Sequence, residues 1–177
     1  MSPDILHKTE IGGVRLNLND PTEIEDAFND IIEAGTKHYP KADIEGVIVS
    51  EMISDGVETV LGVINDPIFG PAVMFGLGGV FVEVLGDVTF RLAPFDLSEA
   101  HRMIAEIKGI KMLYGARGAP SSDIDAIADA LVKLSVFASE NSDKISSIDI
   151  NPFIVRPEGQ GAVGVDALII PHGVDVI

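Results

Sequence analysis

The chain has 177 residues, 46% of them hydrophobic and 23% charged, so it can bury a core and is not expected to be disordered. Its formal net charge of −16 argues against binding to nucleic acid or to an anionic membrane surface. Cysteine is absent, which excludes disulfides and Cys-ligated zinc. The sequence shows neither an apolar run of bilayer length nor a signal or transit peptide, so we expect a cytoplasmic protein.

The hydrophobic pattern predicts the secondary structure in chain order. Apolar residues at helical spacing predict helices at 22–36, where Thr22 and Glu25 form a capping box, at 98–108 and at 122–139. Apolar runs and alternations between turn formers predict strands at 14–18, 47–52, 57–64, 71–75, 80–85, 88–92, 147–155 and 162–170. This order favours an α+β fold, a mostly antiparallel sheet with packed helices, in one domain spanning residues 1–177.

The last two predicted strands form a hairpin that gathers oxygen ligands. A turn centred on Glu158–Gly159 sets Asn151 opposite Asp166, and Asp149 opposite Leu168. Because side chains alternate along a strand, Asp149, Asn151 and Asp166 are expected to share one face. Carboxylate and amide oxygens suit a hard cation such as Mg²⁺, whereas the commoner alternative is simply a solvated polar face. The opposite, core-facing set is expected to be Ile148, Ile150, Ile154, Val163, Val165, Ala167 and Ile169.

Two other segments have the composition of nucleotide-contacting loops. Gly76-Leu-Gly-Gly79 joins two predicted strands, and its glycines, Gly76, Gly78 and Gly79, could let backbone amides approach an anion or could simply make a hairpin turn. Glu51 and Glu58 flank the turn at 54–56, where a carboxylate can meet a ribose or be a solvated strand end.

Arg91 and His7 each allow two interpretations. Arg91 is one charge among apolar neighbours, so it pairs either with an internal carboxylate or with a phosphate. His7 precedes a polar stretch near the N-terminus. A histidine can accept a phosphoryl group as a nucleophile, although one near a chain terminus is more often a surface residue.

In combination these segments resemble the ATP-grasp domain of the NDP-forming acyl-CoA synthetases. This group includes the ADP-forming acetate–CoA ligases and, more distantly, the succinyl-CoA synthetase β chains. Each stretch is weak alone, but the ordered set is specific and covers nearly the whole chain. The matching stretches are Ser2–Leu16, Asp66–Gly79, Val82–Pro94, Asp149–Pro152 and Val165–Ala167.

The resemblance implies a role for each candidate residue. Asn151 and Asp166 match the Mg²⁺ ligands of the family, and Asp149 matches a carboxylate that supports a phosphorylated histidine. His7 matches the histidine that receives a phosphoryl group near the nucleotide. The remaining implied contacts are nucleotide contacts: Glu51 and Glu58 at the hinge and ribose, and Gly76, Gly78, Gly79 and Arg91 on the phosphate side.

The resemblance also implies the activity and its partners. The expected reaction converts a carboxylic acid, CoA and ATP into acyl-CoA, ADP and phosphate, with Mg²⁺ as cofactor and a phosphohistidine as relay. CoA-binding and ligase functions belong to a separate α subunit or domain. The family has an earlier segment with a nucleotide-binding lysine that this chain lacks. We therefore expect the larger, C-terminal part of an ATP-grasp domain, inactive in the full reaction alone.

Two alternatives remain open at this level. The chain could be a non-catalytic ATP-grasp-like module, as in fusions to acetyltransferases, that senses a ligand or holds subunits together. An unfinished sheet edge would also favour a homo-oligomer or capture of a partner.

Overall fold

The computed structural model describes residues 2, 4, 5, 8, 11–79, 86–118 and 120–173. The predicted strand at 80–85 and His7 lie outside the described residues. The chain divides into two compact units, Met1–Ser54 and Asp55–Ile177, each of which is described by itself.

The first unit contains one long helix, α1 (Pro21–His38), which confirms the helix expected at 22–36. Its N-cap is Asp20, whose side chain accepts the Glu23 N–H at 2.9 Å, while the Glu23 carboxylate accepts the Asn19 N–H at 2.7 Å. The predicted cap at Thr22 was therefore wrong by two residues. Pro21 at the first helical position explains the earlier start, since it needs no amide partner there.

The strands expected at 14–18 and 47–52 were wrong. Neither segment belongs to a β-ladder among the described residues of this unit, and Asn17 has a left-handed φ of 58°. Leu16, Ile48 and Val49 are exposed. An alternating pattern does not make a strand without a neighbour that completes its backbone hydrogen bonds.

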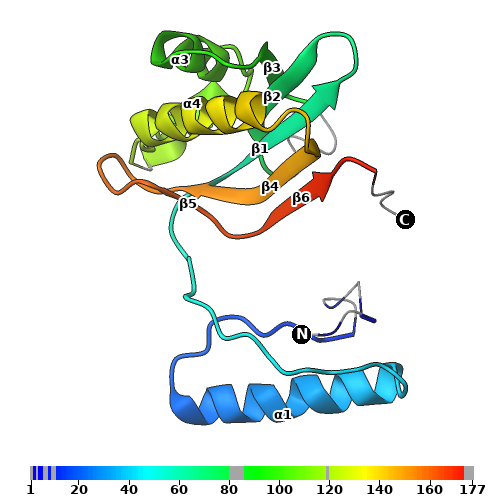
Figure 1. The fold of residues 1–177 in the computed structure, drawn as a ribbon. Helices are drawn as coiled ribbons and strands as arrows, with labels where there is room; N and C mark the ends of the chain where they lie inside the picture. The colour runs from blue at the N-terminus through cyan, green and yellow to red at the C-terminus, as the bar shows by residue number, and fades with distance from the viewer. Residues whose placement is uncertain are drawn as a thin grey trace. The chain divides into compact units, whose positions relative to one another are not determined.

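The second unit is built on an antiparallel sheet, which confirms the predicted fold class (Figure 1). The strand order is β3-β2-β1-β4-β5, and β6 also pairs with β4. The strands are β1 (Val57–Asp66), β2 (Gly70–Leu77), β3 (Val88–Leu92), β4 (Ile145–Val155), β5 (Ala162–Gly164) and β6 (Ala167–Pro171).

Helices α3 (Leu97–Ala105) and α4 (Ile124–Glu140) pack on one face of this sheet, as Figure 1 shows. Short 3₁₀ turns at Ile110–Met112 and Ala116–Gly118 connect them. The buried core lies between the helices and the sheet and includes Leu61, Val63, Val73, Phe75, Leu77, Met103, Ile104, Ile127, Leu131, Phe153 and Val155. We call the sheet face opposite to α3 and α4 the open face.

Strand β4 carries a bulge that changes which of its residues face the core. Thr59 pairs with Phe153 but Leu61 pairs with Ile150, so Asn151 and Pro152 together face one residue of β1. Beyond the bulge the buried positions are Phe153 and Val155, in place of the expected Ile154. A bulge inserts one residue and reverses the alternation that follows it.

The rest of the expected core face of the hairpin was also largely wrong. Ile148 is buried, and Ile150 is partly buried against the core. Val165, Ala167 and Ile169 are exposed. These residues lie at the end of the sheet, which the helices do not cover.

Candidate functional site

The predicted register of the terminal hairpin is confirmed. Val155 pairs with Ala162 and Asp149 pairs with Leu168. Between these pairs the Asn151 N–H donates to the Asp166 carbonyl at 3.2 Å. Asn151 of β4 and Asp166, in the short break between β5 and β6, are therefore direct neighbours across the hairpin, where Cβ atoms of opposed residues lie about 5 Å apart.

The three polar side chains of this hairpin are exposed on the open face. Asp149 pairs with Gly62 of β1, whose own neighbours along the strand, Leu61 and Val63, face the core. Alternation then places Asp149 and Asn151 away from the helices. Asp149, Asn151 and Asp166 are all exposed to solvent.

The donor set suits a cation that completes its coordination shell with other ligands. Oδ1 of Asp166 accepts the Ala167 N–H at 2.9 Å, and the carboxylate has a second oxygen, Oδ2, with which to bind a metal. The described residues contain no group of three or more His, Cys, Asp or Glu side chains that could hold a metal ion. Two carboxylates and one amide would hold an ion weakly, which fits Mg²⁺ shared with phosphates and waters better than a closed protein site.

Glu58 and Gly78 bring the end of β2 against the start of β1. The Gly78 N–H donates to the Glu58 carbonyl at 2.8 Å. A Cβ at Gly78 would lie 3.0 Å from the Glu58 Cβ, so only glycine fits this approach without adjustment. Glu58 itself is exposed. Its neighbour Thr59 pairs with Leu77 and belongs to the buried side of the sheet, so the Glu58 side chain lies on the open face.

The glycine-rich segment is less of a loop than predicted. Gly76 belongs to β2 and pairs with Val60 and Val88 on its two sides. Gly79 has a φ of +60°, in the left-handed region, so the turn begins there. The Gly78 N–H already has a protein acceptor, and its contribution to an anion nest remains a prediction.

Arg91 lies on the helix side of the sheet. It pairs with Val73, a core residue, and its guanidinium forms ion pairs with Glu99 at 2.5 Å and Glu106 at 2.6 Å. The hydrogen bonds that Arg91 donates to Glu106 and Glu99 raise the pKa of Arg91 above its already high value. Of the two alternatives left open by the sequence, the structure shows the carboxylate pairing. A phosphate contact of Arg91 stays a prediction.

The other predicted residues are not gathered by the sheet. Glu51 lies in the first unit, and His7 lies outside the described residues. The register therefore brings together Glu58, Asp149, Asn151 and Asp166 on one face of the second unit.

Gly62, which pairs with Asp149, was not among the predicted site residues. A Cβ at Gly62 would meet Met74 Cε at 3.2 Å and the Ile148 carbonyl at 3.4 Å, so the absence of a side chain leaves room for Met74 on the strand beside Asp149. An isolated glycine within an apolar strand is a signal that could have identified this position, since it often marks a close approach.

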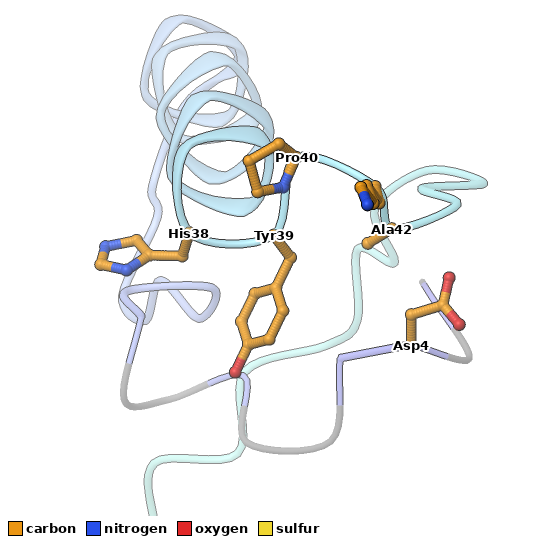
Figure 2. A pocket seen from close by; sticks show the side chains of 6 residues that line it. Asp4, His38, Tyr39, Pro40 and Ala42 are labelled. Carbon is orange, nitrogen blue, oxygen red and sulfur yellow. The ribbon is translucent and has the colours of Figure 1, made fainter.

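The first unit contains a hollow of its own. It has a volume of about 470 Å³, is open to solvent and lies at the C-terminal end of α1 (Figure 2). Its lining is Asp4, His38, Tyr39, Pro40, Lys41 and Ala42. None of these residues was predicted to contact a nucleotide or a metal.

The fold and the hairpin define the class of protein. The chain belongs to the ATP-grasp domain family, whose model matches residues 1–170. Among the described residues, no helix has the length and apolar content needed to span a membrane.

Curated relatives place the chain more narrowly. It is 47% identical over 173 residues to the β subunit of an ADP-forming acetate–CoA ligase II of Pyrococcus furiosus, covering 98% of this chain and 73% of the relative. It is 43% identical over 168 residues to the ADP-forming 4-hydroxybutyrate–CoA ligase of Nitrosopumilus maritimus, covering 95% of this chain and 24% of that one. The chain thus corresponds to the ATP-grasp part of ADP-forming ligases, and a non-catalytic module is not favoured.

Solved structures agree with this placement. The dinucleotide-forming acetyl-coenzyme A synthetase 1 of Ca. Korarchaeum cryptofilum, in complex with coenzyme A, Ca-AMPCP and HgCl⁺, has a TM-score of 0.88 at 46% identity, covering 97% of this chain and 73% of that one. A complex of the same enzyme with coenzyme A and Mg-AMPPCP has a TM-score of 0.85 at 42% identity, covering 97% and 74%. Its phosphohistidine segment is described as pointing towards the nucleotide-binding site.

Proposed function

We propose that this chain is the nucleotide- and Mg²⁺-binding part of an ADP-forming acid–CoA ligase. The observation that carries the proposal is the cross-strand pairing of Asn151 with Asp166, next to Asp149 on the open face. The relatives support it, because they are ADP-forming CoA ligases that match 95% or more of this chain.

The residues of the hairpin have distinct proposed roles. The amide oxygen of Asn151 and Oδ2 of Asp166 would hold Mg²⁺, which when bound neutralises negative charge on the phosphates. Asp149 would accept a hydrogen bond from the ring of a phosphorylated histidine and orient it. His7 would be that histidine or a second carrier of the phosphoryl group, with its ring nitrogen as the nucleophile.

The remaining predicted residues would position the nucleotide. Glu58 would accept a hydrogen bond from a ribose hydroxyl, with Glu51 in the hinge segment. The backbone at Gly76, Gly78 and Gly79 would lie on the phosphate side. Arg91 lies on the helix side of the sheet, where it pairs with Glu99 and Glu106, so the proposal does not use it. A CoA-binding α subunit or domain would complete the reaction, in which acid, CoA and ATP give acyl-CoA, ADP and phosphate.

Calorimetric titration with ADP and ATP tests this proposal. Binding is expected in Mg²⁺, and it is expected to weaken at least tenfold in EDTA and in the double variant Asn151→Ala/Asp166→Ala, because the metal links the hairpin to the phosphates. Asp143→Ala, which removes an exposed carboxylate from the turn before β4, is the charge-matched control and should bind as the wild type does.

Two outcomes would contradict the proposal. Nucleotide binding that is identical with and without Mg²⁺ would contradict the proposed metal site. Equal loss of binding in Asp143→Ala and in the double variant would indicate a nonspecific charge effect rather than coordination.

A further inference from the structure

The turn between β1 and β2 exposes two adjacent large apolar side chains. Ile68 is 82% exposed and Phe69 is 69% exposed. They stand at the tip of the β1–β2 hairpin, at the opposite end of β1 from the linker to the first unit (Figure 1). This tip lies within the Asp66–Gly79 stretch, and the nucleotide site proposed above does not use it.

Asp66 holds this tip in a fixed conformation. Its Oδ1 accepts the N–H of Ile68 and the N–H of Phe69, each at 2.8 Å. These two bonds, that of Phe69 first, lower the pKa of the Asp66 carboxyl, so it stays ionised and keeps both acceptor contacts at neutral pH. A preorganised apolar tip loses little conformational entropy when a partner binds it.

The strands next to the tip also carry an apolar row. Ile64 pairs with Ala72, and Ala72 pairs with Leu92, so the three lie side by side on the open face. Ile64 and Leu92 are 56% and 55% exposed. Single exposed apolar residues are ordinary, but several on one hairpin and its neighbouring strand favour an interaction surface. We call Ile64, Ile68, Phe69 and Leu92 the tip patch.

Charge decides which kind of partner fits the tip patch. A second copy would bring two chains of formal charge −16 together, and the same charge opposes a nucleic acid. A protein surface with an apolar pocket and a basic rim is complementary to an apolar tip on an acidic chain. The relatives provide the candidate, because this segment occurs in them either as a subunit named β or as about a quarter of a longer ligase chain.

We propose that the tip patch docks into an apolar, basic-rimmed pocket on the CoA-binding subunit of the ligase. This inference rests on the proposed function, since it requires such a subunit, but it assigns the contact to a surface remote from Glu58 and the start of β1. Ile68 and Phe69 would be the anchors, because a few large apolar residues usually supply most of the binding energy of an interface.

The test co-expresses the full chain with the CoA-binding subunit of its own ligase and measures their affinity by biolayer interferometry. Ile68→Ala/Phe69→Ala is expected to weaken association about 100-fold, since loss of each anchor costs about a factor of ten. Val136→Ala/Phe137→Ala removes two partly exposed apolar residues from α4 and should change the affinity less than twofold. Affinity should also fall as salt rises, because the rim contacts are ionic.

Several results would overturn the docking proposal. These are absence of association by the wild-type chain, equal affinity of the wild type and the Ile68→Ala/Phe69→Ala variant, or a wild-type homodimer that this variant dissociates in light scattering. Nucleotide titration of the same variant separates the two proposals. If the variant loses docking but still binds nucleotide, the docking role of the tip patch is supported. If the wild-type chain docks but does not bind nucleotide, only the proposed function is rejected.

Discussion

The Asn151 N–H donates to the Asp166 carbonyl at 3.2 Å, at the very place where β4 bulges against β1. On the side of β5 and β6 the pairing keeps one register, from Val155–Ala162 to Asp149–Leu168. The bulge at Asn151 and Pro152 is thus confined to the β1 side of β4, and the pairing with β6 shifts only further along, between Ile145 and Ser147. The candidate metal ligands stay opposed across an uninterrupted register even though the sheet bends beside them.

Thr59 ties the bulge to β1. It is fully buried, and its hydroxyl donates to the Phe153 carbonyl at 2.7 Å. Thr59→Val keeps the shape but removes this donor, so we expect the free energy of unfolding of the second unit to fall by about 1–3 kcal/mol. Urea denaturation followed by circular dichroism measures it. A loss below about 0.5 kcal/mol would mean that the carbonyl finds another donor.

Gly78 is expected to tolerate no side chain without a loss of nucleotide binding. In Gly78→Ala the new Cβ would press on the Glu58 Cβ at 3.0 Å and displace the carboxylate proposed to contact ribose. We expect ADP affinity to fall about tenfold, or about 1.4 kcal/mol, in a calorimetric titration. Gly164→Ala, whose Cβ would meet Ile150 Cγ2 at a similar distance of 3.2 Å, is the control. Equal affinities in the two variants would contradict the ribose contact.

Asp87 anchors the segment after α3 to the start of β3. It is 5% exposed, and its two carboxylate oxygens accept the N–H groups of Lys108 and Gly109, each at 2.8 Å. Asp87→Ala leaves both N–H donors without an acceptor, so we expect the free energy of unfolding to fall by about 3 kcal/mol. Asp87→Asn keeps one acceptor, so we expect a smaller loss. Chemical denaturation compares them. Equal stability of the Ala and Asn variants would show that the two amides are solvated.

Asp123 joins the start of α4 to the hairpin turn. Its oxygens accept the Gly161 N–H at 2.9 Å and the Ala126 N–H at 3.0 Å. The Gly161 bond, followed by the Ala126 bond, lowers the pKa of Asp123 from its ordinary 3.8. Asp123→Asn can still cap α4 through its amide oxygen but presents an NH₂ group to Gly161, so we expect about 1 kcal/mol less stability at pH 7.

The pH dependence of this effect has a definite sign. Because the folded-state pKa of Asp123 lies below the unfolded value of 3.8, its contribution is complete well above that pH and is lost as the pH falls through the lowered pKa. The difference in stability between wild type and Asp123→Asn should therefore shrink on acidification below about pH 4. A difference that stays constant down to pH 2 would contradict the carboxylate role.

The sequence predicted the elements whose partners are close in the chain. The terminal hairpin was placed in its correct register because the turn formers at 156–161 fix its centre, although the second predicted strand is divided into β5 and β6. The helices were found to within a few residues because apolar spacing is a local property. By contrast, the segments at 14–18 and 47–52 looked like strands, but alternation does not state whether a neighbouring strand exists.

Two features of the site depend on long-range pairing and could not be predicted. The switch of buried residues from Ile148 to Phe153 follows from where β4 meets Thr59 of β1, and Pro152 signals an irregularity without giving its direction. The position of Arg91 on the helix side follows from the register of β3 against β2, which brings it to Glu99 and Glu106.

The most direct test of the metal site is the paramagnetic broadening of backbone amide NMR signals by Mn²⁺ in the presence of ADP. Mn²⁺ replaces Mg²⁺ at oxygen ligands and broadens nearby signals. The account predicts that the amides of Asn151, Asp166 and Ala167 are broadened first, at substoichiometric Mn²⁺, and that Asn151→Ala/Asp166→Ala abolishes this selectivity. Preferential broadening at exposed carboxylates of α4, such as Asp125 and Asp129, with the hairpin signals unchanged, would contradict it.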